Sequence, residues 1–172
     1  AFPSEMDVQE CSYSYKYDRN GNITEIQRVP HKGSTEKILK DTFQYDERNQ
    51  LIRENSQSQD KTIVYAYDQG GNLKSVKEYA YTEGTLPETP VHEETGTYSS
   101  TWKDQLLNWD GTAMTYDAVG NMLTRGDTVY TWTMGRKLAC VDNGRKAQYF
   151  YDHTGALLTG LETQYLALCF PG

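Results

Sequence analysis

Five aspartates recur in the same local setting, and carboxylates in such number could perform acid–base chemistry or bind calcium. Each follows a tyrosine and precedes a glycine or asparagine by three residues; they are Asp18, Asp46, Asp68, Asp117 and Asp152. Paired carboxylates act as general acid and general base in glycoside hydrolysis. That chemistry needs one distinct pair, whereas a repeat supplies many equivalent carboxylates. We therefore predict that each aspartate accepts hydrogen bonds from backbone N–H groups in its own turn, and that the chain has no catalytic residues.

The glycine that follows most of these aspartates supports the turn interpretation. Glycine adopts a positive φ at no steric cost, and asparagine tolerates the same conformation. The predicted turn residues are Asp18, Gly21, Asp46, Asp68, Gly71, Asp117, Gly120, Asp152 and Gly155. A calcium loop places several acidic ligands at alternate positions, whereas each of these turns carries one aspartate, beside Arg19 or Gln69 in two of them. We therefore predict no metal site.

Histidines and cysteines are scattered along the chain. They are His31, His92, His153, Cys11, Cys140 and Cys169. Zinc sites use closely spaced Cys or His pairs, and three distant cysteines form no disulfide framework. We expect surface histidines and mostly buried free thiols, while one disulfide and a Cys140–His153 nucleophilic pair stay open as alternatives. Gly70 and Gly71 precede a predicted strand and not a helix, which argues against a phosphate loop, so no cofactor is predicted.

Rows of aromatic residues are the best candidates for ligand binding. Exposed aromatic stripes flanked by polar groups can stack on sugar rings or bind a partner protein. The alternative is that the same rings pack across neighbouring strands and hold the sheet together. The candidate ligand-binding residues are Tyr13, Tyr15, Tyr17, Tyr65, Tyr67, Tyr79, Tyr81 and Trp132.

The composition is polar, with 37% hydrophobic residues, 24% charged residues and 14 tyrosines among 172 residues. Tyrosine can be half-buried with its hydroxyl in water, which suits a sheet with two partly buried faces. The net charge is −7, and no basic stripe is present. Both features argue against nucleic-acid binding and against binding to anionic membranes. No apolar run approaches the roughly 18 residues of a membrane-spanning helix.

The elements that carry these residues follow a repeated phrase, which we call the Tyr-Asp phrase: aromatic, any residue, Tyr, Asp, two residues, Gly-Asn, apolar. Its copies are 15–23, 65–73 and 114–122, with looser copies at 43–51 and 149–157 and degenerate ones at 98–107 and 130–138. Aromatic and β-branched residues alternate with period two around the phrase, which is typical of strands. Each copy therefore predicts a strand, a short turn and a second strand. The fold class is all-β, an antiparallel array of β-hairpins with almost no helix.

Turn residues and composition also predict the organisation of the chain. Asn143-Gly144 predicts a type I′ turn, 125–128 a second tight connection, and 29–35 a long hairpin loop. Proline, glycine and acidic residues interrupt the alternation between the two repeat blocks. The predicted divisions are a first block at 11–82, an acidic loop or hinge at 83–97, a second block at 98–160, and a tail at 161–172 that matches no repeat unit.

The Tyr-x-Tyr-Asp-x-x-Gly-Asn phrase resembles the YD repeat of the RHS (rearrangement hotspot) family. This family includes bacterial wall-associated proteins, insecticidal toxin-complex components and, distantly, the teneurins. The resemblance covers roughly residues 13–160. It implies a wide antiparallel sheet that spirals into a shell around a toxin or another polypeptide, in a protein that is secreted or carried on the bacterial cell surface.

The sequence thus favours a non-catalytic structural module that shields or presents another polypeptide. The alternative is a module that binds carbohydrate or a cell-surface partner through its Tyr and Trp stripes. Strands at the two ends of such an array have unpaired backbone groups. We expect these edges to be covered by the rest of an RHS polypeptide, by the terminal segments or by a second copy of the chain. No nucleic-acid binding and no membrane insertion are expected.

Overall fold

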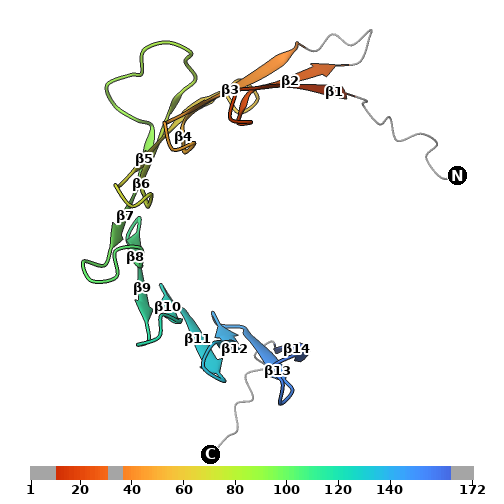
Figure 1. The fold of residues 1–172 in the computed structure, drawn as a ribbon, viewed down its shortest axis with the longest axis vertical. Coiled ribbons are helices and arrows are strands. Elements are labelled where there is room, and N and C mark those ends of the chain that lie inside the picture. Colours follow the sequence, from red (N-terminus) through yellow and green to blue (C-terminus); the bar gives the residue numbers. More distant parts are fainter. Residues whose placement is uncertain (1–10, 31–36, 164–172) are drawn as a thin grey trace, which may run out of the picture. The chain divides into compact units, whose positions relative to one another are not determined.

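The computed structural model describes residues 11–30 and 37–163, and these residues form fourteen strands and no helix (Figure 1). The strands are β1 (Cys11–Tyr17), β2 (Ile23–Pro30), β3 (Leu39–Tyr45), β4 (Leu51–Ser56), β5 (Lys61–Tyr67), β6 (Leu73–Ala80), β7 (His92–Tyr98), β8 (Leu106–Trp109), β9 (Thr112–Tyr116), β10 (Met122–Arg125), β11 (Thr128–Thr133), β12 (Lys137–Asp142), β13 (Lys146–Tyr151) and β14 (Leu157–Thr163). Each strand pairs with its neighbours in chain order, and the strand pairs are antiparallel. The predicted all-β antiparallel fold is confirmed. The described residues contain no helix long and apolar enough to cross a membrane.

The chain forms two compact units that divide between Thr95 and Gly96. The boundary lies inside β7. The first half of this strand pairs with β6 in the first unit, from Ser75↔Thr95 to Glu78↔His92. Its second half pairs with β8 in the second unit.

One register rule holds in the Tyr-Asp hairpins of both units. The aromatic residue that ends the first strand faces the apolar residue that begins the second. The pairs are Tyr17↔Ile23, Tyr45↔Leu51, Tyr67↔Leu73, Tyr98↔Leu106, Tyr116↔Met122, Trp132↔Leu138 and Tyr151↔Leu157. The register shifts at or beside each pair, as at a β-bulge. The degenerate copies at 98–107 and 130–138 are hairpins of this kind, as predicted.

The predicted acidic loop at 83–97 extends too far, because strand β7 begins at His92. The Val91 N–H already donates to the Glu78 carbonyl at 2.7 Å. Within β7, Glu93 forms an ion pair with Lys77 of the neighbouring strand at 3.2 Å. The acidic residues Glu93 and Glu94, which suggested a loop, therefore belong to a strand paired with β6. The tail boundary at 161 is also too early, because β14 continues to Thr163; the rest of the tail lies outside the described residues.

The predicted type I′ turn at Asn143-Gly144 is wrong. Such a turn needs positive φ at both residues, and Gly144 has a φ of +91° while Asn143 is not among the positive-φ residues. The pair Asp142↔Lys146 closes a three-residue loop instead. The Asp142 carboxylate accepts the Gly144 N–H and the Asn143 side chain accepts the Arg145 N–H, each at 3.2 Å. Side-chain bonds thus stabilise a wider loop than the dipeptide indicates.

Other connections are tight. Asp110 and Gly111, with φ of +46° and +82°, form a two-residue turn of the I′ kind between Trp109 and Thr112. The predicted tight connection at 125–128 is confirmed, with Arg125 paired to Thr128 and Gly126 at a φ of +54°. Of the long loop predicted at 29–35, the first two residues belong to β2, and 31–35 lie outside the described residues.

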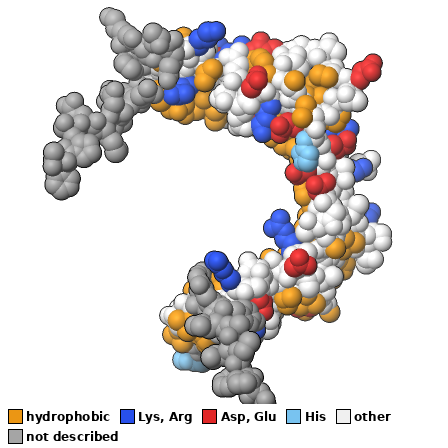
Figure 2. Space-filling model, turned by 180° about the vertical axis from the view of Figure 1, so that it is seen from behind, with side chains coloured by type: hydrophobic (Ala, Val, Ile, Leu, Met, Phe, Trp, Pro, Cys, Tyr) orange, Lys and Arg blue, Asp and Glu red, His pale blue; other side chains and the backbone are white. Residues whose placement is uncertain are grey.

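Few side chains are fully buried. Among the described residues, Tyr79 and Met114 are the only buried hydrophobic side chains, with 8% and 7% of their surface exposed. Figure 2 shows hydrophobic side chains interleaved with charged and other polar ones on the visible face. Strands β10 and β11 of the second unit alternate in exposure, and in β11 Tyr130 is half-buried while Val129 is exposed. Strand β2 of the first unit is half-buried along its whole length.

Candidate functional site

The five repeated carboxylates are engaged in their own turns. One oxygen of Asp18 accepts the N–H groups of Asn20 and Asn22, both at 2.9 Å. The same pair of bonds, to the residues two and four positions ahead, recurs at 2.8–3.0 Å for Asp46, Asp68, Asp117 and Asp152. These carboxylates are held as hydrogen-bond acceptors within the turns.

Hydrogen bonding also changes the acidity of these groups. Bonds from Asn22 and Asn72, chiefly from their side chains, lower the pKa of Asp18 and Asp68. The Thr154 hydroxyl is the largest cause that lowers the pKa of Asp152. Burial opposes the shift at Asp117, but bonds from Asn121 outweigh it and lower the pKa. The charged form of these four aspartates is therefore favoured, because a hydrogen bond to the carboxylate favours that form.

The residues that follow each aspartate complete the turn. Gly21, Gly71, Gly120 and Gly155 have φ of +82° to +92°, and Asn49 takes the same place in the Asp46 turn with a φ of +62°. The asparagine after the glycine has a role that the sequence analysis missed. Its side-chain amide donates to the second carboxylate oxygen at 2.7–2.9 Å in the turns of Asp18, Asp68 and Asp117.

The aromatic residues of the Tyr-Asp phrase join neighbouring hairpins. Each donates a hydrogen bond to the carbonyl oxygen of an apolar residue at the start of the preceding strand. The bonds are Tyr45 to Ile23 and Tyr67 to Leu51, both 2.9 Å, Tyr116 to Leu106 and Trp132 Nε1 to Met122, both 2.7 Å, and Tyr151 to Leu138, 2.9 Å. We call this set the aromatic ladder. Trp replaces Tyr in it because the indole N–H is also a donor.

The predicted ligand-binding tyrosines fall into two groups. Tyr13, Tyr15 and Tyr17 of β1 have 54%, 48% and 60% of their surface exposed. The others are engaged or buried. Tyr65 donates to Glu54 at 3.3 Å, and burial raises the pKa of Tyr65 to about 12.

The remaining candidates also have partners or are covered. Tyr79 is buried, and the Tyr81 hydroxyl donates to Glu83 at 2.8 Å. Tyr67 and Trp132 belong to the aromatic ladder. A ligand-binding role for this set stays a prediction.

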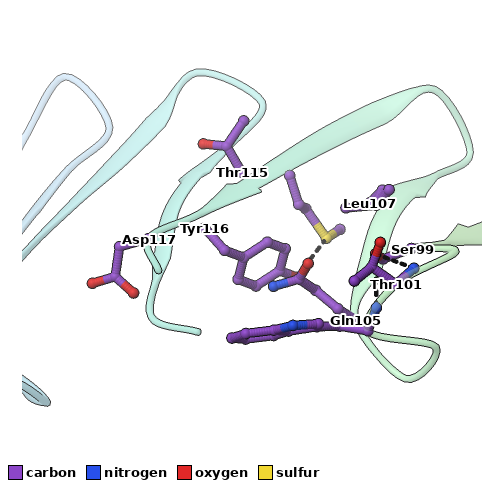
Figure 3. A pocket seen from close by; sticks show the side chains of 9 residues that line it. Ser99, Thr101, Gln105, Leu107, Thr115, Tyr116 and Asp117 are labelled. Carbon is purple, nitrogen blue, oxygen red and sulfur yellow. Dashed lines mark hydrogen bonds between the residues drawn. The ribbon is translucent and has the colours of Figure 1, made fainter. Parts of the chain in front are cut away.

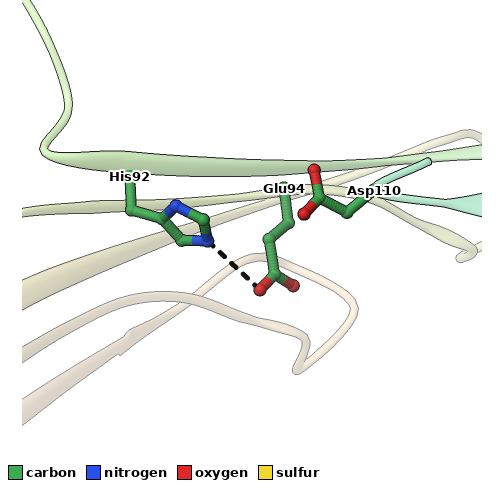
Figure 4. Close-up of side chains that lie close together, drawn as sticks. All are labelled: His92, Glu94 and Asp110. Atoms are coloured by element: carbon green, nitrogen blue, oxygen red, sulfur yellow. Dashed lines mark hydrogen bonds and ion pairs between the residues drawn. The ribbon is translucent and has the colours of Figure 1, made fainter. Parts of the chain in front are cut away.

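Histidines and cysteines lie apart in the fold. The exposed His92 ring approaches Glu94 at 3.3 Å on the same strand (Figure 4). His153 lies in the turn between β13 and β14, and Cys140 lies in β12. Cys11 and Cys140 are half-buried free thiols, less buried than expected. His31 and Cys169 lie outside the described residues.

The second unit has an apolar pocket of about 480 Å³ that the sequence analysis did not foresee. Its lining residues are Leu106, Trp109, Met114, Tyr116, Met122, Arg125, Tyr130, Trp132 and Leu138. They come from neighbouring strands, and alternation places Met114 with Tyr116, and Tyr130 with Trp132, on one face. In β8 and β10 a register shift beside the first residue lets Leu106 and Trp109, and Met122 and Arg125, line the same pocket although they are three positions apart. Arg125 is the one charged residue among them. Of these nine, only Trp132 was a candidate from the sequence.

The comparison with protein-family models decides the family. The model described as the teneurin YD-shell matches residues 6–167. The chain belongs to the YD-shell family. The resemblance to RHS and YD-repeat proteins that the Tyr-Asp phrase indicated is thereby confirmed. No curated protein shows a significant match to this YD-shell chain.

Solved structures show the same fold. The YD-shell chain is similar to the structure titled "Crystal Structure of TcdB2-TccC3-Cdc42", with 21% identity and a TM-score of 0.61 over 90% of this chain. It is also similar to "Crystal Structure of TcdB2-TccC3-TEV", with 21% identity and a TM-score of 0.62 over 92% of this chain. In both cases it spans only 9% of the length of the matched chain.

The first unit of this YD-shell chain contains a buried polar network. Asn55, Ser56 and Thr62 are buried, with 3%, 0% and 0% of their surface exposed. The Thr62 hydroxyl donates to the Thr82 carbonyl and accepts the Thr82 N–H, both at 3.0 Å. Arg53 donates to Asn55 at 2.7 Å and to the carbonyl of Thr82 at 2.8 Å. The network therefore holds the chain at the point where it leaves β6.

Proposed function

We propose that this chain is a non-catalytic structural segment of a YD-repeat shell, in an RHS protein that is secreted or carried on the cell surface. Its role is to shield or present another polypeptide. The aromatic ladder is the observation that carries this proposal. Its bonds join successive hairpins of both units through backbone carbonyls, so the recurring aromatic residues of the repeat serve to hold the sheet together.

The state of the carboxylates supports a role without catalysis. A general acid or base must reach a substrate proton, within hydrogen-bond distance or through one water. Each repeated aspartate instead accepts two N–H bonds in its turn, and its pKa, where shifted, moves down and not toward neutrality. The groups that recur in the sequence are those that close turns.

The apolar pocket of the second unit is the proposed contact surface for the shielded polypeptide. Tyr, Trp, Met and Arg are enriched at the centres of protein interfaces, and all four line this pocket. Methionines such as Met114 and Met122 adapt to varied partners because their side chains are flexible and polarisable. A pocket of this composition suits an extended polypeptide without one fixed sequence.

A photo-crosslinking experiment tests the proposal in the complete gene product that contains this segment. The photoreactive residue p-benzoylphenylalanine is placed at Tyr130, which lines the pocket. The matched control is the same probe at Val129, its neighbour in β11, which is 48% exposed and points to the other face of the strand. We expect the probe at position 130 to link to a polypeptide segment outside the repeat array, and the probe at 129 not to.

Equal crosslinking from both positions, or crosslinks from position 130 confined to its own hairpin, would contradict the proposed contact. An activity on any substrate that disappears on a single Asp or His substitution would contradict the non-catalytic role.

Binding of a glycan or cell-surface partner through aromatic stripes is the second candidate function. The exposure of Tyr13, Tyr15 and Tyr17 along β1 favours this second function at that strand. The hydrogen-bonded rings of Tyr65 and Tyr67 in β5 and the buried ring of Tyr79 in β6 do not favour this function. A glycan array with the chain and with Tyr15→Ala discriminates: binding that the substitution removes supports this function, and no binding across a broad panel argues against it.

A further inference from the structure

The connection between β7 and β8 holds a tryptophan at the protein surface. The Ser99 hydroxyl oxygen accepts the N–H groups of Thr101 and Trp102, at 3.2 and 3.1 Å. Two backbone bonds close the loop: Gln105 N–H to the Trp102 carbonyl at 2.7 Å, and Ser99 N–H to the Gln105 carbonyl at 2.9 Å. The loop is therefore ordered by its own bonds, yet 45% of Trp102 is exposed.

The neighbouring turn braces this tryptophan. A Cβ added to Gly120 would lie 3.1 Å from the Trp102 ring, so the indole lies directly against the glycine. Close packing there fixes the orientation of the ring. An exposed aromatic ring that is both held by its loop and braced from the side forms a ready platform for a ligand.

The platform borders a pocket of about 370 Å³ (Figure 3). This volume lies at the lower end of the roughly 300–1,000 Å³ typical of small-molecule sites. The lining residues are Ser99, Thr101, Trp102, Gln105, Leu107, Met114, Thr115, Tyr116 and Asp117. Apolar surface and uncharged polar groups thus face the same space.

The pocket carries no positive charge among its lining residues. Its one ionised residue is Asp117, whose oxygens already accept the Asn121 N–H at 2.8 Å and the Asn121 amide at 2.7 Å. The Ser99 oxygen accepts two N–H groups, which leaves its own proton to donate. The Gln105 amide has no hydrogen-bond partner among the described residues, so it can both donate and accept. A phosphate would find no opposite charge among these lining residues.

We propose that this pocket binds a neutral sugar ring. The apolar face of a pyranose would stack on the Trp102 indole, and its hydroxyl groups would bond to the Gln105 amide and the Ser99 hydroxyl. A sugar matches the pocket because it combines an apolar face with an uncharged polar rim. A neutral peptide fits less well, since extended peptides are recognised along a sheet edge or a long groove. This site is separate from the β1 tyrosines and goes beyond the shell function.

Titration of the 172-residue chain with simple glycosides tests the proposal. The probes are methyl β-glucoside, methyl β-galactoside, N-acetylglucosamine and cellobiose, followed by tryptophan fluorescence and saturation-transfer NMR. We expect saturable binding of at least one probe, with a Kd on the order of 1 mM or weaker, because an open site offers few contacts. Trp102→Ala should weaken it at least about tenfold, since it removes the stacking surface.

Two further variants make the test decisive. Gln105→Leu keeps the backbone bonds of the loop and should weaken binding about threefold to tenfold, as expected for one lost hydrogen bond. If Trp102→Ala fails to fold, the affinity of Gln105→Leu tests the proposal in its place. Phe150→Ala is the matched control, because Phe150 lies in the same unit and is also 45% exposed. It should leave binding unchanged.

No saturable binding of any probe would overturn the proposal, and so would equal loss of binding in Phe150→Ala and Trp102→Ala. Binding of a neutral blocked tripeptide that depends on Trp102, with no binding of sugars, would assign the pocket to polypeptide instead. None of these outcomes bears on the crosslinking from position 130, so failure here is distinguishable from failure of the shell function.

Discussion

The two units of this chain share the same hairpins but differ in what lies between their strands. In the first unit Thr62 and Asn55 are buried in a polar network. In the second unit Trp109, Tyr130 and Met122 line an apolar pocket. The Asp turns and the aromatic ladder are the same in both. The interactions that recur in both units are made to backbone groups, which leaves the facing side chains free to differ.

This separation has a physical basis. The Asp carboxylates bond to N–H groups, and the ladder aromatics bond to carbonyl oxygens, so neither depends on the identity of the facing residues. The side chains at the remaining positions need only compatible partners. Polar positions in the first unit satisfy one another, while apolar positions in the second leave a surface that another molecule can cover.

The largest expected effect comes from the buried hydroxyl of the first unit. Thr62→Val keeps the shape but removes the buried hydroxyl that bonds both the N–H and the carbonyl of Thr82, which should cost about 3 kcal/mol of unfolding free energy. Urea denaturation with hydrogen exchange to locate the change measures it. The control is Thr115→Val in the second unit, where the exposed hydroxyl bonds only to Thr124; we expect about 0.5 kcal/mol or less. Equal losses of unfolding free energy in Thr62→Val and Thr115→Val would contradict this difference between the two units.

The next largest expected loss of stability comes from substituting a turn glycine by alanine. Gly120 and Gly21 both have a φ of +88°, so alanine is strained at either, by roughly 1–2 kcal/mol. Only at Gly120 would the added Cβ meet a ring, 3.1 Å from Trp102, whereas at Gly21 it meets nothing within 4 Å. Gly120→Ala should therefore destabilise more than Gly21→Ala, by about 1 kcal/mol further. Thermal unfolding compares them, and equal losses would show that Trp102 moves aside freely.

The aromatic ladder should contribute equally in both units. Tyr67→Phe and Tyr116→Phe each remove one hydroxyl bond to a carbonyl, at 2.9 and 2.7 Å, and each should cost about 1 kcal/mol. Tyr17→Phe is the control, because Tyr17 is 60% exposed. Chemical denaturation of the three variants checks the prediction. A loss of stability in only one of Tyr67→Phe and Tyr116→Phe would show that the ladder bonds do not stabilise both units.

The smallest expected difference between the units is their response to acid. The folded pKa is lowered at Asp18 and Asp68 of the first unit and at Asp117 and Asp152 of the second. A lowered pKa contributes stability above the unfolded value, about 3.9, and that stability is lost as pH falls through the folded pKa. Both units should therefore lose stability together below about pH 4.

Melting temperatures measured from pH 6 to pH 2 test this expectation. Asp68→Asn removes one titrating group and should flatten the profile relative to the parent chain. A profile that stays level in acid for the parent chain would contradict the role of the turn carboxylates in stability.

Local patterns were predictable where the interactions are local. The period-two alternation and the Gly after Asp predicted strands and turns that the structure contains, and Asn49 was recognisable as a substitute for glycine. Predictions failed where a distant or side-chain partner decides the outcome. Glu93 lies in a strand that pairs with β6, where Lys77 faces it, and the side chains of Asp142 and Asn143 bond within the three-residue loop.

The sequence by itself determined the hairpins and indicated the family, because each Tyr-Asp phrase contains the donors and acceptors that close its own turn. Tertiary structure alone decided which aromatic rings are engaged, exposed or gathered into pockets. Tyr65 and Tyr15 have the same local setting, yet one donates to Glu54 and the other is 48% exposed. The fate of a side chain on a sheet depends on the residues of the neighbouring strand, and strand pairing supplies those only when the chain folds.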